Sequence, residues 1–269
     1  MKELTLKETR QIEFGILKHF KEFCEKNDIT YYLSNGTLLG AVKYKGFIPW
    51  DDDIDIFVPR KDYDRLIDIY NDTHRYKLFS VERVPKFSFP FAKLCDMTTD
   101  KQEIDVDNGI ELGLDIDIFP LDVWPEQKET ATHYAQKINS YVNKIHCTKL
   151  PLKKGKSFLR TIGKIAILLF YRMLGARYYV DKIKKMAREN VSLKKVNYMG
   201  CVSWPIYGEK EIIPAKVFSD KTELEFEGEK FSAPIGYDTY LRRLYGDYEK
   251  DPPIDEQKTH HKFKAYKVV

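Results

Sequence analysis

The sequence has few cysteines and no long apolar run. Its four cysteines are widely spaced and form no CxxC pair: Cys24, Cys95, Cys147 and Cys201. This spacing argues against a disulfide framework or a zinc site and predicts free thiols, as in a cytosolic protein. No apolar stretch follows Met1, so we expect no secretory signal. The apolar run at 165–171 is far shorter than the roughly 18 residues that span a bilayer.

The chain is long and apolar enough to fold around a sizeable core. It has 269 residues, of which 43% are hydrophobic and 14% aromatic, so disorder is not expected. Its charge is unevenly distributed. The segment 149–195 has 14 Lys or Arg against two acids, a net charge of +12. Because the whole chain carries +4, the remainder carries −8. We expect one part of the protein to meet anions and another to hold surplus carboxylates.

The surplus carboxylates concentrate in "GFIPWDDDIDIFV", residues 46–58. The segment 53–58 alternates acid and apolar residues as a strand does, so Asp53 and Asp55 share a face, with Asp51 joining them if the strand begins early. Two carboxylates about 6 Å apart repel by about 3 kcal/mol at an effective dielectric of 20. A divalent cation would reverse this repulsion, and an all-oxygen ligand set fits Mg²⁺ or Mn²⁺. The alternative is an acidic edge strand that blocks aggregation.

Two further segments extend this candidate site. A second alternating strand at 113–119, ended by Pro120, could supply Asp117 or its rival Asp115. Upstream, Gly36 and Thr37 precede a predicted helix at 37–42, whose free N–H groups suit a phosphate. Lys43 lies just beyond.

The order of predicted elements indicates an α/β fold. Thr5 and Glu8 have capping-box spacing at the start of a helix. Short strands are predicted at 29–34 and 87–95, and a helix at 62–70. The segment 128–197 is mostly helical, with a break at 151–156. In the region 212–269, "ELEFEGEKF" predicts a β-hairpin turning at Gly228, and 237–245 a helix closed by Gly246. We expect one domain over 1–269, with a mixed-sheet core and a basic helical insertion.

Three segments resemble blocks of the LicD family of phosphotransferases, which includes fukutin-related proteins. They are "YYLSNGTLLGAVKYKGFIPWDDDIDIFVPRKDYDRL", "IDIFPLD" and "YDTYLRRLYGDYEKDPPIDEQKTHH". The resemblance implies a nucleotidyltransferase-like fold. It also implies Mg²⁺-dependent transfer of phosphocholine from CDP-choline to a sugar hydroxyl of teichoic acid or lipopolysaccharide. Related donors carry ribitol or glycerol phosphate.

The resemblance also assigns roles to residues. The metal would be held by Asp51, Asp53, Asp55 and Asp117, and the last three would be catalytic. The residues expected to contact substrate are Gly36, Thr37, Lys43, Arg60, His260 and His261. Arg60 could equally be a surface residue, and the two histidines part of a polar tail. Trp50, Tyr44 and Phe47 could offer aromatic faces to choline, or could belong to the core.

Several alternatives stay open at this point. The same fold could carry a nucleotidyltransferase that releases pyrophosphate, or a membrane-docked assembly partner without activity. The basic insertion could bind an anionic membrane surface, which would place a cytoplasmic protein at the inner face of the membrane. It could instead be core-packing helices with a solvated basic face. We expect no nucleic-acid partner, since no such motif is present.

Overall fold

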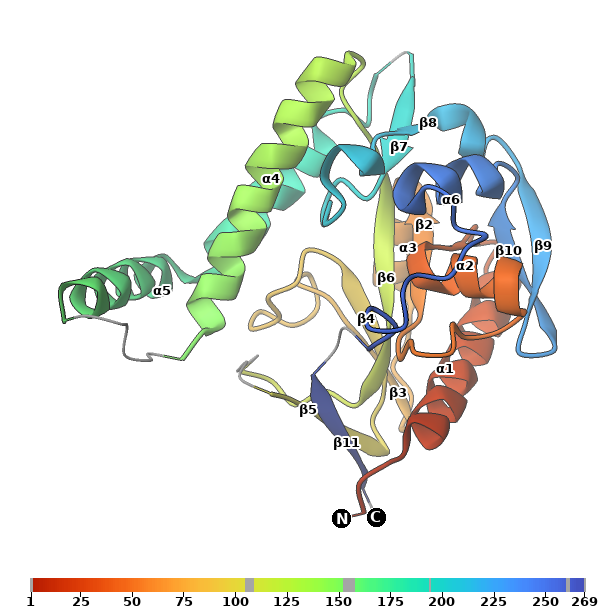
Figure 1. The fold of residues 1–269 in the computed structure, drawn as a ribbon, viewed down its shortest axis with the longest axis horizontal. Coiled ribbons are helices and arrows are strands. Elements are labelled where there is room, and N and C mark those ends of the chain that lie inside the picture. Colours follow the sequence, from red (N-terminus) through yellow and green to blue (C-terminus); the bar gives the residue numbers. More distant parts are fainter. Residues whose placement is uncertain (1, 105–108, 152–157, 194, 260–261, 269) are drawn as a thin grey trace.

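A mixed β-sheet forms the centre of the molecule, with helices around it (Figure 1). The computed structural model describes residues 2–104, 109–151, 158–193, 195–259 and 262–268. The strands of the main sheet are β1 (Tyr32–Leu33), β2 (Asp55–Pro59), β3 (Tyr76–Phe79), β4 (Ala92–Asp96), β6 (Leu114–Val123), β7 (Tyr198–Gly200) and β8 (Ile213–Pro214). Their order is β1-β2-β6-β4-β3, and β7 joins the far end of β6 and pairs with β8. This α/β architecture confirms the predicted fold class.

The sheet places the two acidic strands side by side. β2 and β6 run parallel, in a register that pairs Asp55 with Asp117. β4 runs antiparallel on the other side of β6 and pairs Lys93 with Asp117. Most apolar residues of β2 and β6 are buried, among them Ile56, Val58 and Ile116, so the carboxylates interrupt a core sheet and not an exposed edge.

Helices α1 (Leu6–Lys26), α2 (Asn35–Tyr44) and α3 (Arg60–Ile69) complete the amino-terminal half. The predicted capping box of α1 is confirmed, because Thr5 Oγ1 accepts from the N–H of Glu8 and the Glu8 carboxylate accepts from the N–H of Thr5. The apolar face of α1 buries Ile16, Leu17 and Phe20 in the main core.

The helical insertion predicted at 128–197 contains two helices, α4 (Lys128–Lys149) and α5 (Phe158–Arg188). α4 and the second half of α5 share a separate apolar cluster that includes Ile138, Ile145, Val180 and Ile183. Gly175, with φ of 77°, breaks the helical backbone of α5. The first half of α5 projects from the body of the molecule at the lower left of Figure 1. Within the described part of the chain, no helix has the length and apolar character needed to cross a membrane.

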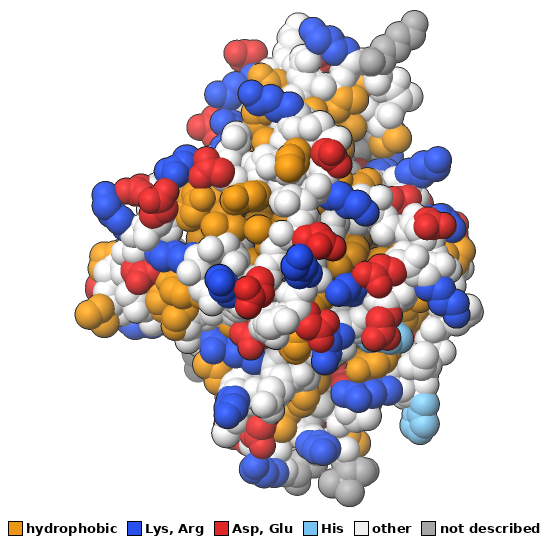
Figure 2. Space-filling model, turned by 90° about the vertical axis from the view of Figure 1, so that its right-hand side faces the viewer, with side chains coloured by type: hydrophobic (Ala, Val, Ile, Leu, Met, Phe, Trp, Pro, Cys, Tyr) orange, Lys and Arg blue, Asp and Glu red, His pale blue; other side chains and the backbone are white. Residues whose placement is uncertain are grey.

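The carboxy-terminal region returns to the amino-terminal half. It contains two short 3-10 helices (Gly208–Glu211 and Ala215–Phe218), β9 (Lys221–Phe226), β10 (Glu229–Pro234), α6 (Tyr237–Tyr245) and β11 (Phe263–Lys267). The predicted hairpin and helix are both confirmed: β9 and β10 pair across Gly228, and α6 ends at Gly246. β11 pairs with β5 (Thr99–Glu103), which brings the two termini together. Acidic and basic side chains are interspersed over the face that carries the hairpin (Figure 2).

Several predicted boundaries were wrong. Pro120 does not end its strand, because β6 runs on to Val123. The pairing of β6 with β4 stops at Ile118, so Pro120 lacks a ladder partner on that side and its missing N–H is tolerated. The strand predicted at 53–58 begins only at Asp55, and those at 29–34 and 87–95 shrink to β1 and β4. The first helical residues of α2 and α3 are Asn35 and Arg60, two residues earlier than predicted in each case.

Candidate active site

The first turn of α2 is packed directly against the acidic segment. Asn35 has a left-handed backbone with φ of 44°, which an asparagine accepts more readily than most residues. At Gly36, an added Cβ would lie 2.5 Å from Oδ2 of Asp51. A side chain here would therefore displace the Asp51 carboxylate from the amino-terminal end of α2.

Hydrogen bonds tie the same turn to the start of β2. The N–H of Asp55 donates to Thr37 Oγ1 at 2.8 Å, and the N–H of Ser34 donates to the carbonyl of Asp55 at 3.0 Å. Thr37 is buried, so its hydroxyl acts on the backbone of β2 and is not exposed to a substrate. The helix start and the carboxylate of Asp55 are thus held in one fixed arrangement.

Three consecutive carboxylates lie close enough to share a cation. One oxygen from each of Asp51, Asp52 and Asp53 falls within 4.8 Å of the others. Asp55, the first residue of β2, lies beside Asp117 of β6. The predicted ligands therefore cluster. Asp53 precedes β2, and it lines the same cavity as Asp55.

The charges in this cluster disturb one another. Burial, reinforced by Asp53 beside it, raises the pKa of Asp51 to about 8. Burial also raises the pKa of Asp55 well above its ordinary value, with Asp53 and Asp117 adding to the rise. For Asp117, burial raises the pKa although Lys93 opposes the change. The cluster therefore favours bound protons, or a cation in their place.

A divalent cation fits this set of donors. Asp51 and Asp53 face each other closely enough that a hydrogen bond between their carboxyl groups contributes to the raised pKa of Asp51. A cation bound between these oxygens would replace that proton. Oxygen-only donors of this kind suit Mg²⁺ or Mn²⁺.

Asp115 lies in a different environment from Asp117. Its side chain is 1% exposed and forms ion pairs with both Lys93 and Lys101. Burial alone would raise the pKa of Asp115, but Lys101 and Lys93 hold it well below its usual range. Asp117 is 23% exposed and also bonds to Lys93. Lys93 therefore links two acids of β6, the almost fully buried Asp115 and the partly exposed Asp117.

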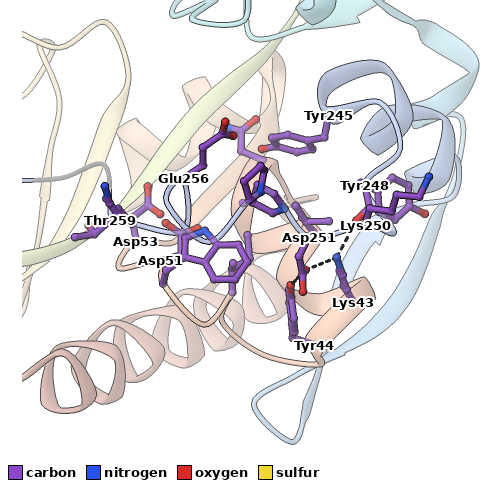
Figure 3. Close-up of a pocket in the computed structure, with 18 of the residues that line it drawn as sticks. Lys43, Tyr44, Asp51, Asp53, Tyr245, Tyr248, Lys250, Asp251, Glu256 and Thr259 are labelled. Atoms are coloured by element: carbon purple, nitrogen blue, oxygen red, sulfur yellow. Dashed lines mark hydrogen bonds and ion pairs between the residues drawn. The ribbon is translucent and has the colours of Figure 1, made fainter.

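A cavity of about 990 Å³ opens over the carboxylates (Figure 3). It is lined by Gly36, Lys43, Asp51, Asp53 and Asp55, together with residues of α6 and of the carboxy-terminal segment as far as Lys262. Lys43 forms an ion pair with Asp251, which also accepts a hydrogen bond from the Tyr44 hydroxyl. Lys250 and Lys258 also line this cavity. We call it the large pocket. Its size and its mixture of lysines and carboxylates suit a phosphorylated ligand.

Other predicted site residues lie elsewhere. Arg60 does not appear among the described residues that line the large pocket. Its Nε and Nη2 atoms donate to the buried carboxylate of Asp122 at 2.7 and 2.6 Å. The substrate contact predicted for Arg60 is therefore replaced by a structural ion pair between α3 and β6. His260 and His261 lie outside the described residues.

Two of the three aromatic residues suggested for choline reach the large pocket. Trp50 and Tyr44 line it, with ring centroids 6.3 Å apart. Phe47 is buried, packs against Phe226 and has the Arg10 guanidinium over its ring. The face of Phe47 is thus already covered.

Several contributors were not predicted from the sequence. Lys93 and Lys101 touch the acidic strand β6 from β4 and β5. Asn35 accepts a hydrogen bond from the buried Tyr240 hydroxyl, which anchors the turn to α6. An asparagine directly before the Gly-Thr pair was the available signal for Asn35. Lys93 and Lys101 had no such signal in the sequence, because only the arrangement of the strands brings them to the acids of β6.

Comparisons with known proteins show the family of the chain. The family described as LicD/FKTN/FKRP, nucleotidyltransferase domain, matches residues 28–156, which contain α2, β2 and β6. A lipopolysaccharide cholinephosphotransferase LicD of Haemophilus influenzae is 32% identical over 275 positions, covering 99% of each chain. Uncharacterised proteins of Rickettsia prowazekii and Rickettsia typhi are 45% identical over 49 residues, 18% of this chain. The end-to-end match shows that the chain belongs to the LicD family.

Proposed function

We propose that the protein transfers phosphocholine from CDP-choline to a sugar hydroxyl of a cell-surface glycan precursor, with Mg²⁺ or Mn²⁺ as cofactor. The observation that carries the proposal is the carboxylate cluster of Asp51, Asp53 and Asp55 at the floor of the large pocket, against the amino-terminal end of α2. The full-length similarity to a lipopolysaccharide cholinephosphotransferase supports the choice of phosphocholine and of lipopolysaccharide as an acceptor. Teichoic acid is the second acceptor to test.

The residues of the large pocket have distinct tasks in this proposal. Asp51, Asp53, Asp55 and Asp117 would hold the metal, which supplies positive charge against the donor diphosphate. The cavity would take the cytidine nucleotide. Lys43 lies on α2 beside it and would exchange its ion pair with Asp251 for the diphosphate. Gly36 adds no side chain at the start of α2, which leaves room there for the Asp51 carboxylate.

Asp117 is better placed than Asp115 to accept the proton of the attacking hydroxyl. Asp115 is enclosed by two lysines, and its depressed pKa makes it a weak base. Both acids border the same cavity, but the Asp117 side chain is the more exposed of the two, and burial raises its pKa. A carboxylate in this position can accept the proton as the new bond to phosphorus forms and CMP leaves.

The first half of α5 supports a location at a membrane surface. Between residues 162 and 174 only Leu168 is buried, and Met173 is 75% exposed. The exposed apolar side chains of this stretch are Ile162, Ile167, Leu169, Phe170, Met173 and Leu174. A helix with an unpartnered apolar face, in a segment with a net charge of +12, suits the surface of an anionic bilayer. Only the second half of α5 fits the core-packing alternative.

Vesicle binding tests the membrane assignment. The double variant Phe170→Ser/Met173→Ser should reduce flotation with phosphatidylglycerol vesicles at least tenfold, since each lost side chain removes about 1 kcal/mol or more of apolar burial. The matched control is Leu6→Ser, an exposed apolar residue at the start of α1. If the control loses as much vesicle binding as the double variant, or if the double variant loses none, the apolar face of α5 has another role.

A donor panel tests the proposed reaction. Purified protein, Mg²⁺ and either lipopolysaccharide or teichoic acid are incubated with CDP-choline, CDP-ribitol, CDP-glycerol or CTP, and the nucleotides are resolved by chromatography. We expect glycan-dependent CMP from CDP-choline. CMP from CDP-ribitol or CDP-glycerol alone would keep the mechanism and change the donor. Release of pyrophosphate from CTP, with no CMP from any CDP donor, would show nucleotidyl transfer in place of phosphocholine transfer. No nucleotide release from any donor would favour an assembly partner without activity.

A further inference from the structure

A second, smaller cavity adjoins the carboxylates on the side of β4. It has a volume of about 460 Å³ and is bordered by Asp53 and Asp117. Its aromatic walls come from Phe89, Phe91, Trp204 and Phe263, and we call it the aromatic chamber. Three of these rings are mutual neighbours, with centroid distances of 5.3 Å from Phe91 to both Phe89 and Trp204, and 6.1 Å between Phe89 and Trp204.

The rings of this chamber already carry cations. Lys149 Nζ lies 3.8 Å from the centroid of Phe89. Lys93 Nζ lies 5.2 and 5.7 Å from Phe89 and Phe91, and Lys101 Nζ lies 4.6 Å from Phe263. These contacts fall within the range of cation–π attraction, about 6 Å. These aromatic rings thus already meet positive charge: Lys93 and Lys101 line the chamber, and Lys149 lies over the ring of Phe89.

The chamber and the large pocket meet at the carboxylates. Asp53 and Lys262 line both cavities, whereas Asp51 and Asp55 line only the large pocket and Asp117 only the chamber. If a diphosphate binds at Asp53, the nucleotide can lie in the large pocket, and the group on the second phosphate can lie in the chamber. Lys93 contacts Asp117 and also faces Phe89 and Phe91, so the rings lie close to the reacting phosphate's expected position.

We propose that the aromatic chamber binds the quaternary ammonium group of the donor, with Lys149 occupying its place on Phe89 when no donor is bound. The inference rests on the proposed choline donor. Glu103, which also lines the chamber, supplies a carboxylate to the cationic group. The chamber thereby assigns choline recognition to residues other than Trp50 and Tyr44 of the large pocket.

A trimethylammonium group suits this wall better than a lysine ammonium does. It has no N–H groups, so burial among aromatic rings leaves no donor unsatisfied, and its methyl groups fill apolar space. The Lys149 ammonium lies over the ring of Phe89, where it loses hydration, and this burial lowers its pKa to about 8. Lys149 is the last residue of α4, so its side chain can withdraw without disturbing a helix interior.

Calorimetric titration in the presence of Mg²⁺, with no acceptor, tests the assignment. The ligands are CDP-choline, its neutral isostere with carbon in place of nitrogen, and CDP. Wild type should prefer CDP-choline to the isostere by about tenfold, from a cation–π contribution of about 1–2 kcal/mol. Phe89→Leu and Trp204→Leu should each abolish most of this preference while the affinity for CDP is unchanged. Phe14→Leu is the matched control, because Phe14 carries a lysine cation but lines neither cavity.

A second variant avoids the risk that a core substitution unfolds the chain. Lys149→Met removes the competing cation and should tighten CDP-choline binding several-fold without changing CDP binding. An unchanged CDP-choline affinity in Lys149→Met, with the preference retained in Phe89→Leu and Trp204→Leu, overturns the chamber assignment alone. The assignment is also overturned if Phe89→Leu and Trp204→Leu raise only the KM for the glycan in turnover assays, because the chamber would then be an acceptor subsite. No preference in the wild type overturns the choline donor itself, and the chamber with it.

Discussion

Asp51→Asn should make the metal-free protein more stable and less sensitive to pH. Asp51 lies against Gly36, and burial together with Asp53 raises its pKa from 3.8 to about 8. The folded state therefore binds a proton on Asp51 at pH values where the unfolded state has released it. Asparagine has nearly the same shape and carries no charge, so it removes this linkage while keeping the packing.

The sign and size of the effect follow from the raised pKa. Between about pH 4 and pH 8 the folded state holds one more proton than the unfolded state, so stability falls as pH rises and levels off above about pH 8. The slope is about 1.4 kcal/mol per pH unit for one proton. From pH 6 to pH 7.5 wild type should lose about 2 kcal/mol through this group, or about 4 °C in Tm for a chain of this size.

Thermal denaturation in the presence of chelator measures this pH dependence of stability directly. Wild type and Asp51→Asn are compared at pH 6, 7 and 7.5. The difference in Tm between Asp51→Asn and wild type should grow with pH by about 4 °C across that range. Mg²⁺ should raise the Tm of wild type more than that of the variant. The exposed carboxylate variant Asp68→Asn serves as the control. A Tm difference that does not change with pH would refute the reasoning.

Further variants test the carboxylates, the Arg60–Asp122 ion pair and the start of α2. Asp53→Asn and Asp55→Asn should each lower kcat by at least 100-fold, about 3 kcal/mol, with the metal-free Tm held or raised; wild-type turnover at saturating Mg²⁺ would contradict the metal assignment. Arg60→Met should cost about 3–5 kcal/mol in urea denaturation, because it leaves Asp122 buried without its cation. Adding Asp122→Leu should recover much of that loss, and failure to do so would argue against the ion pair. Gly36→Ala should weaken CDP binding in calorimetry, since its Cβ would lie 2.5 Å from Asp51 Oδ2; unchanged affinity would mean that the turn relaxes freely.

Local chemistry made much of the fold predictable. The capping box at Thr5 and the turn at Gly228 depend on residues close together in the chain, and both were confirmed. The two acidic strands were also recognisable from their alternation, although neither boundary was right. Pro120 misled because its effect depends on where the partner strand β4 ends, which the sequence of β6 alone does not state.

The parts of the site that depend on sheet register were not predictable. Lys93 contacts Asp115 and Asp117 only because β4 lies antiparallel to β6. Arg60 follows the acidic strand in sequence and was expected at the phosphate, yet its side chain pairs with Asp122 on the neighbouring strand. The aromatic chamber combines β4, β6 and the segment after β7, so no single stretch of sequence could have indicated it.

The most direct test of the proposed reaction follows each phosphorus of the donor. CDP-choline is prepared with ³²P either in the phosphate that bears choline or in the phosphate that bears cytidine, and is incubated with the protein, Mg²⁺ and lipopolysaccharide. The account predicts that the choline-side label appears in the glycan and that the cytidine-side label leaves as CMP. Transfer of the cytidine-side label to the glycan would contradict it.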